Sequence, residues 1–284
     1  MIRREEIVAT SNVDRHRERI VLSGLESLVA AANGSYVPVI VDHDPRCPPI
    51  GRVIGARIDD LPDGEHAVVG IYEIFEPGDQ LQSAPGREIP LSSYDHGRVQ
   101  LSFDRTYHDV DSRALIDEIC ELLKSTPQEE GKKALEPISV LTIGAAVILG
   151  AVATGFLNAL GQDAYKAVKE RLTKLCVPRR GKGDEQLFRV ELSVSDGVRR
   201  VNVDVIFTNP SDDDVEYALG QMLYDVDDAL PRLMLQDIEV RRIVFEARQR
   251  TLRFKFAVRW DAVPVLLADP ASPASASEGD RSPE

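Results

Sequence analysis

The chain has 284 residues, of which 43% are hydrophobic, so it can bury a core and is not disordered as a whole. Its formal net charge of -13 repels phosphate groups, which argues against nucleic-acid binding as its main function. The three cysteines, Cys47, Cys120 and Cys176, lie far apart, which excludes a disulfide framework and a thiolate zinc site and fits a reducing compartment. The charged N-terminus has no apolar run, so we expect no secretory signal there.

The first 112 residues combine short apolar, β-branched runs with Gly and Pro turns. Several such strands in succession predict a β-rich barrel or an α+β domain. A helix is expected over residues 25–32, because Asn33-Gly34 is a good C-terminal signal. The strands are expected at residues 6–10, 36–42, 52–58, 67–75 and 99–103.

An amphipathic helix is expected next, over residues 112–124. Leu115, Ile119 and Leu122 fall there at helical spacing, which puts them on one face. The polar residues 125–136 that follow predict a linker.

Residues 137–160 carry no charge and are rich in Ala and Gly. The segment is long enough to cross a bilayer, which takes about 20 residues, and its small residues let helices approach closely. We expect an apolar helix that either spans a membrane or is buried in a soluble or oligomeric protein. A third alternative is a segment that is sheltered at rest and inserts on activation. Residues 161–186 are basic and predict an amphipathic helix over 162–176 with a linker.

The last part of the chain predicts two hairpins around one helix. Asp196-Gly197 is a hairpin signal, and Ser211 with Asp214 forms a capping box that opens a helix to about residue 233. The order ββαββ predicts one helix on an antiparallel sheet. The four strands are expected at residues 187–194, 201–207, 239–246 and 251–260.

Together these patterns predict an α+β protein with a β-rich, barrel-like N-terminal domain, an apolar helical segment and a C-terminal ββαββ domain. The Pro-, Ser- and acid-rich end is expected to be disordered. The expected units are an N-terminal domain 1–124, a linker 125–136, an apolar helical segment 137–160, a basic helix and linker 161–186, a ββαββ domain 187–267 and a tail 268–284.

Four short motifs in the first part of the chain carry a resemblance. They are Val13-Asp14-Arg15, His43 after an apolar run, Ile50-Gly51-Arg52-Val53, and Leu101-Ser102-Phe103. In this order they resemble the HK97-like prohead (capsid maturation) proteases of tailed bacteriophages. That family consists of serine peptidases with a herpesvirus-assemblin-like fold. The resemblance covers roughly residues 5–110, and its His element is more specific than its Ser element.

The resemblance implies a serine-peptidase site. His43 would be the general base and Ser102 the nucleophile, because a serine hydroxyl needs a neighbouring imidazole to take its proton. A third group should orient the imidazole, and Asp104, His108 and Asp109 are open alternatives for it. One departure matters: Phe103-Asp104 follows the serine where the family favours a small apolar residue and Gly, which weakens an oxyanion hole.

Other polar clusters are read as structural. In Asp42-His43-Asp44, alternate residues of a strand point to opposite faces, so we expect no metal site there. The acids of Asp212-Asp213-Asp214 are explained by the positive end of a helix dipole. Cys47 lies beside Arg46 and close to His43, but a reactive thiol there is the less favoured reading. We expect neither a metal nor a cofactor.

Two function classes follow. The first is a serine endopeptidase with a His/Ser site, fused to a membrane-inserting segment and acting as a stress or anti-phage effector. The second is a catalytically degenerate, protease-like binding or adaptor protein that is membrane-associated or oligomeric. The expected partners are a protein or peptide substrate, a membrane and a second copy of the chain, with no nucleic acid. The expected location is the cytoplasm or the inner membrane. The Ser102→Ala variant discriminates the two classes.

Overall fold

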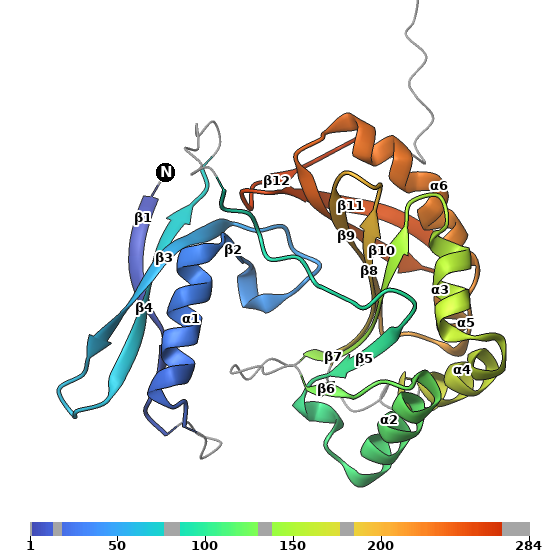
Figure 1. Cartoon of the computed structure of the whole chain (residues 1–284), viewed down its shortest axis with the longest axis horizontal. Coiled ribbons are helices and arrows are strands. Elements are labelled where there is room, and N and C mark those ends of the chain that lie inside the picture. Colours follow the sequence, from blue (N-terminus) through green and yellow to red (C-terminus); the bar gives the residue numbers. More distant parts are fainter. Residues whose placement is uncertain (1, 14–18, 77–85, 130–137, 177–184, 269–284) are drawn as a thin grey trace, which may run out of the picture.

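The computed structural model describes residues 2–13, 19–76, 86–129, 138–176 and 185–268. They form an α+β protein, as predicted, and its strands make two sheets (Figure 1). The first sheet has four antiparallel strands in the order β1-β4-β3-β2. The second has eight strands in the order β12-β11-β10-β9-β8-β7-β5-β6 and mixes parallel and antiparallel pairs.

The first sheet and one helix come from the N-terminal part of the chain. The helix packs through Leu25 on Ala56 and Val68, which together form a small core. Within the described residues the sheet is open, so the expectation of a barrel is wrong. The elements are β1 (Ile2–Thr10), α1 (Leu22–Gly34), β2 (Val37–Val39), β3 (Gly51–Asp60) and β4 (His66–Ile74).

The second sheet carries its helices on one face, where they bury the main core (Figure 1). Its strands are β5 (Val99–Phe103), β6 (Gln128–Glu129), β7 (Ile138–Ile148), β8 (Glu185–Ser195), β9 (Arg200–Thr208), β10 (Val240–Arg248), β11 (Thr251–Arg259) and β12 (Pro264–Val265). The helices are α2 (Val110–Leu123), α3 (Val152–Leu160), α4 (Gln162–Cys176), α5 (Asp212–Leu219) and α6 (Gln221–Gln236).

The apolar segment 137–160 is not one helix, which corrects the prediction. Its described part forms strand β7, a turn at Gly150 with φ of 80°, and the nine-residue helix α3. Because β7 lies between β5 and β8 and is buried on both faces, it has no polar side to reveal a strand period. In the described ranges, no helix is both long and apolar enough to cross a membrane.

The C-terminal part also differs from the expected ββαββ sheet. Strands β9 and β10 are parallel, and the helix between them breaks at Gly220 into α5 and α6. Strands β7 and β8 are likewise parallel and joined by the pair α3 and α4. The predicted capping box of Ser211 and Asp214 is confirmed. Because β5 and β7 pair within the same sheet, the expected unit 1–124 contributes strands to both sheets, and the expected unit 187–267 shares its sheet with β5, β6 and β7.

The two sheets meet through a second core on the face of the large sheet that the helices leave uncovered. Tyr36 is buried there, with the guanidinium groups of Arg52 and Arg87 over its ring at 4.4 and 4.7 Å from the centroid. Arg52 also donates to the carboxylate of Glu73 at 2.9 Å and to the carbonyl of Asp261 at 3.0 Å. Arg52 therefore links β3 to the turn that follows β11 in the second sheet.

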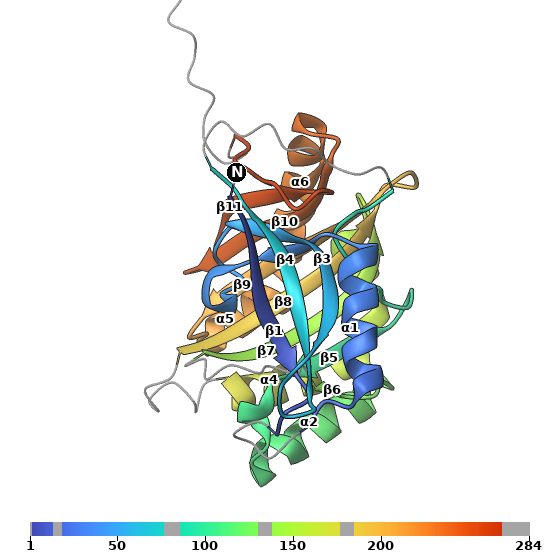
Figure 2. The same ribbon diagram turned by 90° about the vertical axis from the view of Figure 1, so that its left-hand side faces the viewer.

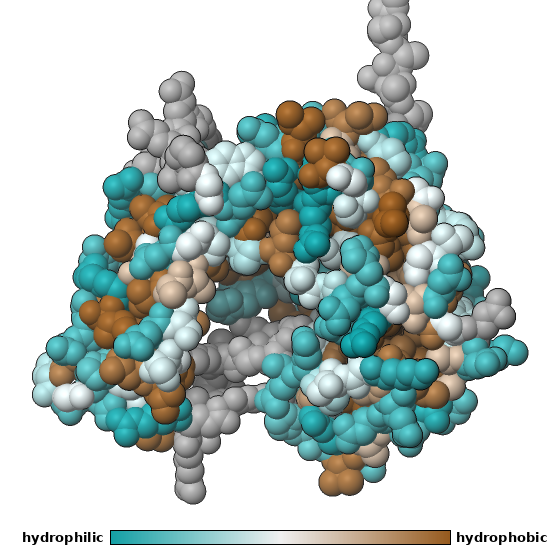
Figure 3. All heavy atoms as spheres, viewed as in Figure 1, coloured by the Kyte–Doolittle hydropathy of each residue, from teal (hydrophilic) through white to brown (hydrophobic). Residues whose placement is uncertain are grey.

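The face of the large sheet that lies opposite its helices also carries a buried polar network. Asp204, on β9, is completely buried and accepts from Arg189 at 2.7 Å and from Arg242 at 2.5 Å. Tyr94 lies over Gly144 of β7, where a Cβ atom would overlap its ring. Burial, reinforced by the charge of Glu191, raises the pKa of the Tyr94 phenol well above its usual value. Figure 3 shows the surface hollowed between the two sheets.

Candidate functional site

The predicted base and nucleophile come from different sheets. His43 lies in a short 3-10 turn (Val41–His43) between β2 and β3 of the first sheet, with a left-handed φ of 52°. Ser102 lies on β5 of the second sheet, opposite Thr142 of β7 and Gln128 of β6. The pairing of His43 with Ser102 stays a prediction of the sequence.

The candidates for the third group have structural contacts. Asp104 is buried and accepts from the backbone amide of Val140 at 2.6 Å and from that of Thr106 at 2.9 Å. Asp109 is the N-cap of α2, where it accepts from the Ser112 amide at 2.9 Å. The His108 ring lies 3.2 Å from the Glu129 carboxylate.

These contacts show what the acids do for the fold. Asp104 joins the end of β5 to the start of β7, and Asp109 starts α2. Since both carboxylates satisfy backbone donors, a role for either in orienting His43 would compete with those bonds. Ser102 and all three candidates lie on β5 or shortly after it in the chain, whereas His43 lies between β2 and β3 of the first sheet.

A polar pocket of about 830 Å³ lies where the parallel strands β9 and β10 end. The crevice outside the carboxyl ends of parallel strands is where open α/β sheets commonly bind ligands. Among the described residues that line it, Ala247 is the only apolar one. The lining residues are Arg46, Glu185, Thr208, Asn209, Ser211, Asp213, Asp214, Glu246, Ala247, Arg248, Gln249 and Arg250.

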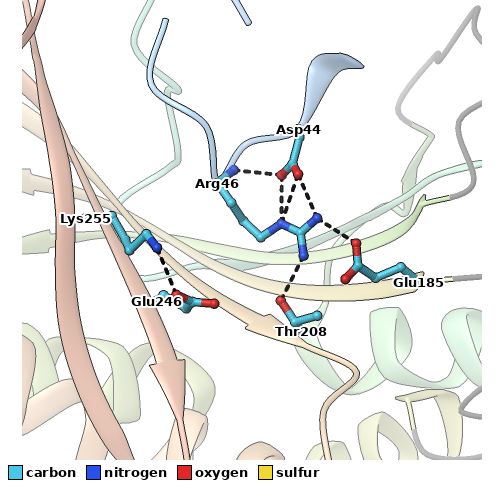
Figure 4. Close-up of polar contacts among 6 residues, drawn as sticks. All are labelled: Asp44, Arg46, Glu185, Thr208, Glu246 and Lys255. Atoms are coloured by element: carbon cyan, nitrogen blue, oxygen red, sulfur yellow. Dashed lines mark hydrogen bonds and ion pairs between the residues drawn. The ribbon is translucent and has the colours of Figure 1, made fainter. Parts of the chain in front are cut away.

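Arg46 lies in the connection between β2 and β3 of the first sheet and lines one side of this pocket (Figure 4). Its guanidinium donates to Asp44 at 2.7 Å, to Glu185 at 2.6 Å and to Thr208 at 3.2 Å. Hydrogen bonds with Asp44 and Glu185 raise the pKa of Arg46 above its ordinary value. Two carboxylates share this one cation, so this side of the pocket keeps a negative charge.

The opposite side is formed by the β10–β11 hairpin. Glu246 is paired with Lys255 at 3.1 Å, and Arg250 with Asp213 at 3.5 Å (Figure 4 draws the first pair). Arg248 is exposed and forms no ion pair within the part of the chain that the structure describes. It is therefore the lining cation best able to receive an anionic group.

The turn that carries these arginines is strained. Gln249 and Arg250 both have left-handed φ values, 52° and 57°. Two-residue hairpins need such angles at both positions and favour Asn-Gly there, because other L residues crowd the following carbonyl. Strain of this kind is common at binding sites.

Replacing this pair by Asn-Gly (Gln249→Asn with Arg250→Gly) should stabilise the fold. We expect the free energy of unfolding to rise by about 1 kcal/mol, since the left-handed conformation costs about that much per ordinary residue. Chemical denaturation measures it, with Arg250→Lys, which keeps the strain, as the unchanged control. Equal stability of the Asn-Gly variant and the wild type would show that the turn is relaxed.

Sequence reasoning missed this pocket. It singled out His43 and Cys47 but not Arg46 between them. One local signal was available: Asp44-Pro45-Arg46 forms an Asx turn, in which the Arg46 amide donates to the Asp44 carboxylate at 2.9 Å. The partners Glu185 and Thr208 lie far along the chain, and no local pattern points to them.

No family model, no curated protein and no solved structure matches this chain. Among the described residues, no group of three or more His, Cys, Asp or Glu side chains is arranged to hold a metal ion. The chemistry of the pocket is that of ion pairs and hydrogen bonds, and any function assigned to it has to follow from those.

Proposed function

We propose that this chain is a non-catalytic binding or adaptor protein whose pocket at the ends of β9 and β10 takes a polar peptide segment with an acidic side chain. The observation that carries the proposal is the pocket itself. It combines a volume of about 830 Å³ with a lining that is almost wholly polar and with Arg248 available at its rim.

Size and charge both support a peptide. The volume falls within the range of about 300–1,000 Å³ typical of ligand sites, but those sites are mostly apolar and this one is not. Arg248 suits a carboxylate, which a guanidinium binds through two parallel hydrogen bonds. The negative side formed by Asp44 and Glu185 around Arg46 suits a basic or amide group further along the same segment.

The lining favours binding over catalysis. It contains one serine, Ser211, whose hydroxyl donates to Asp214 at 2.7 Å as part of the helix cap. Among the described residues that line it there is no histidine, the side chain that most often exchanges protons near neutral pH.

The proposal is tested with a phage-displayed library of random dodecapeptides selected on the full chain. We expect enriched peptides to share an acidic residue. Arg248→Glu should weaken the best of them about tenfold or more, because a hydrogen-bonded charge pair contributes about 1.5–3 kcal/mol. Isothermal titration measures the affinities.

The matched control is Arg98→Glu, which reverses an exposed arginine in the turn before β5, outside the pocket. It should bind the same peptides as the wild type does. Peptides that bind equally well to both variants, or a selection without any acidic preference, would overturn the proposal.

The serine endopeptidase stays a prediction from the sequence resemblance. A fluorophosphonate probe followed by intact mass spectrometry tests it directly. Labelling or self-cleavage of the wild type that is lost in Ser102→Ala would establish the peptidase. Unlabelled wild type that still selects acidic peptides would favour the adaptor.

A further inference from the structure

Strand β1 is an exposed edge. Among the strands that the structure describes, it lies at the rim of the first sheet and pairs only with β4 (Figure 2). Every residue from Ile2 to Val8 is exposed, including apolar Ile7 with 58% of its surface accessible. A strand of this length with unpaired backbone groups is a template for pairing with another strand.

The charges of β1 fall into two sets, one on each face. Arg3 and Glu5 share the face on which Arg3 reaches Glu73 of β4 at 3.0 Å and Glu5 reaches Arg57 of β3 at 2.8 Å. Arg4 and Glu6 share the other face. Neither forms an ion pair within the described part of the chain.

We propose that two copies of this chain associate by pairing their β1 strands antiparallel, with the two-fold axis at Glu5. Side chains directly opposite one another in such a pair lie on the same face. In this register Arg4 of each copy faces Glu6 of the other, and Ile2 faces Val8. Arg4 and Glu6, which form no ion pair with the described residues of their own chain, are thus the two charges that the second copy neutralises.

The residue on the axis fits this register. The two Glu5 side chains approach each other there, but in each copy a hydrogen bond from Arg57, which also pairs with Asp59, lowers the pKa of Glu5 and places a positive charge beside it. The neighbouring register, centred on Arg4, would place Arg4 against Arg4 and Ile2 against Glu6. That register would oppose Arg3 to Glu5, which already have partners within the chain, and would leave Glu6 without a cation, whereas the register centred on Glu5 pairs Arg4 with Glu6 twice at the cost of one like-charge contact on the axis.

Charge reversal tests the pairing by sedimentation equilibrium of the full chain at low ionic strength. The wild type should form a concentration-dependent dimer. Arg4→Glu and Glu6→Arg should each weaken it about tenfold or more, because each change places like charges opposite one another twice across the two-fold axis. The double variant Arg4→Glu with Glu6→Arg should regain the wild-type dissociation constant.

Arg98→Glu is again the control, since it changes net charge by the same amount as Arg4→Glu but lies outside β1. Circular dichroism establishes that each variant is folded, as expected for exposed side chains. A chain that stays monomeric at every soluble concentration would overturn the proposal. So would a dimer that is indifferent to the single reversals, or a double variant as weak as the singles. None of these outcomes bears on the pocket.

Discussion

Replacing Asp204 with alanine should lower the free energy of unfolding by about 3–5 kcal/mol, the cost of leaving buried charges without their partner. This carboxylate is completely buried and is shared by Arg189 and Arg242 at the centre of the large sheet. Without it, Arg242 would lose this partner and Arg189 would keep Glu191, at 2.9 Å, while both guanidinium groups remain largely buried. Urea denaturation measures the loss.

The control is Asp228→Ala, which removes an exposed partner of Arg232 and should change stability by less than about 1 kcal/mol. A loss from Asp204→Ala as small as that of the control would mean that water reaches the network.

The same carboxylate predicts a pH dependence. Burial raises the pKa of Asp204, but the positive charges of Arg189 and Arg242 outweigh burial and hold that pKa below its ordinary value. A lowered pKa in the folded state gives stability that is fully present above the unfolded value of about 3.9 and is lost as pH falls through the folded value. The wild type should therefore lose stability in acid more steeply than Asp204→Ala does.

The second large effect is expected at the joint between the sheets. Arg52→Met should lower the free energy of unfolding by about 3 kcal/mol or more, since it leaves buried Glu73 with only the exposed Arg3 as a cation. It also removes the guanidinium over Tyr36 and the bond to the Asp261 carbonyl. Chemical denaturation followed by Trp260 fluorescence measures the effect close to the joint.

A second variant separates charge from packing. Arg52→Met combined with Glu73→Leu removes both members of the pair and should recover part of the loss, because no buried carboxylate is left unpaired. If the double variant is less stable than Arg52→Met alone, the carboxylate of Glu73 stabilises the fold by itself and the ion pair is not the main contribution.

Local elements could be predicted from the sequence because their signals are local. Strand β5 and helix α4 have the bounds that their patterns indicate, and the Ser211 cap starts α5 as expected. The pairing of β5 with β7 could not be read in this way. Nothing in the run Val99–Phe103 shows which of several strands lies beside it.

The pocket illustrates the same limit. Arg46 meets Glu185 and Thr208 only because the connection after β2 folds against the edge of the second sheet. Nothing in the sequence distinguishes these three side chains from ordinary surface residues. Their place in the pocket follows from this contact between the two parts of the fold. His43 and Ser102, by contrast, were found through a resemblance that concerns short motifs and contains no information on the packing of this chain.

The arrangement of the large sheet has one more consequence, which concerns handedness. The connections β7-α3-α4-β8 and β9-α5-α6-β10 advance across the sheet in the same direction and place their helices on the same face, yet their strands point in opposite directions. Two such crossovers have opposite handedness, so one of them is left-handed, although about 98% of parallel crossovers are right-handed. The tight turn at Asp196-Gly197 reverses the chain between the two connections, and the shared core keeps both pairs of helices on one face, so the two connections differ in handedness.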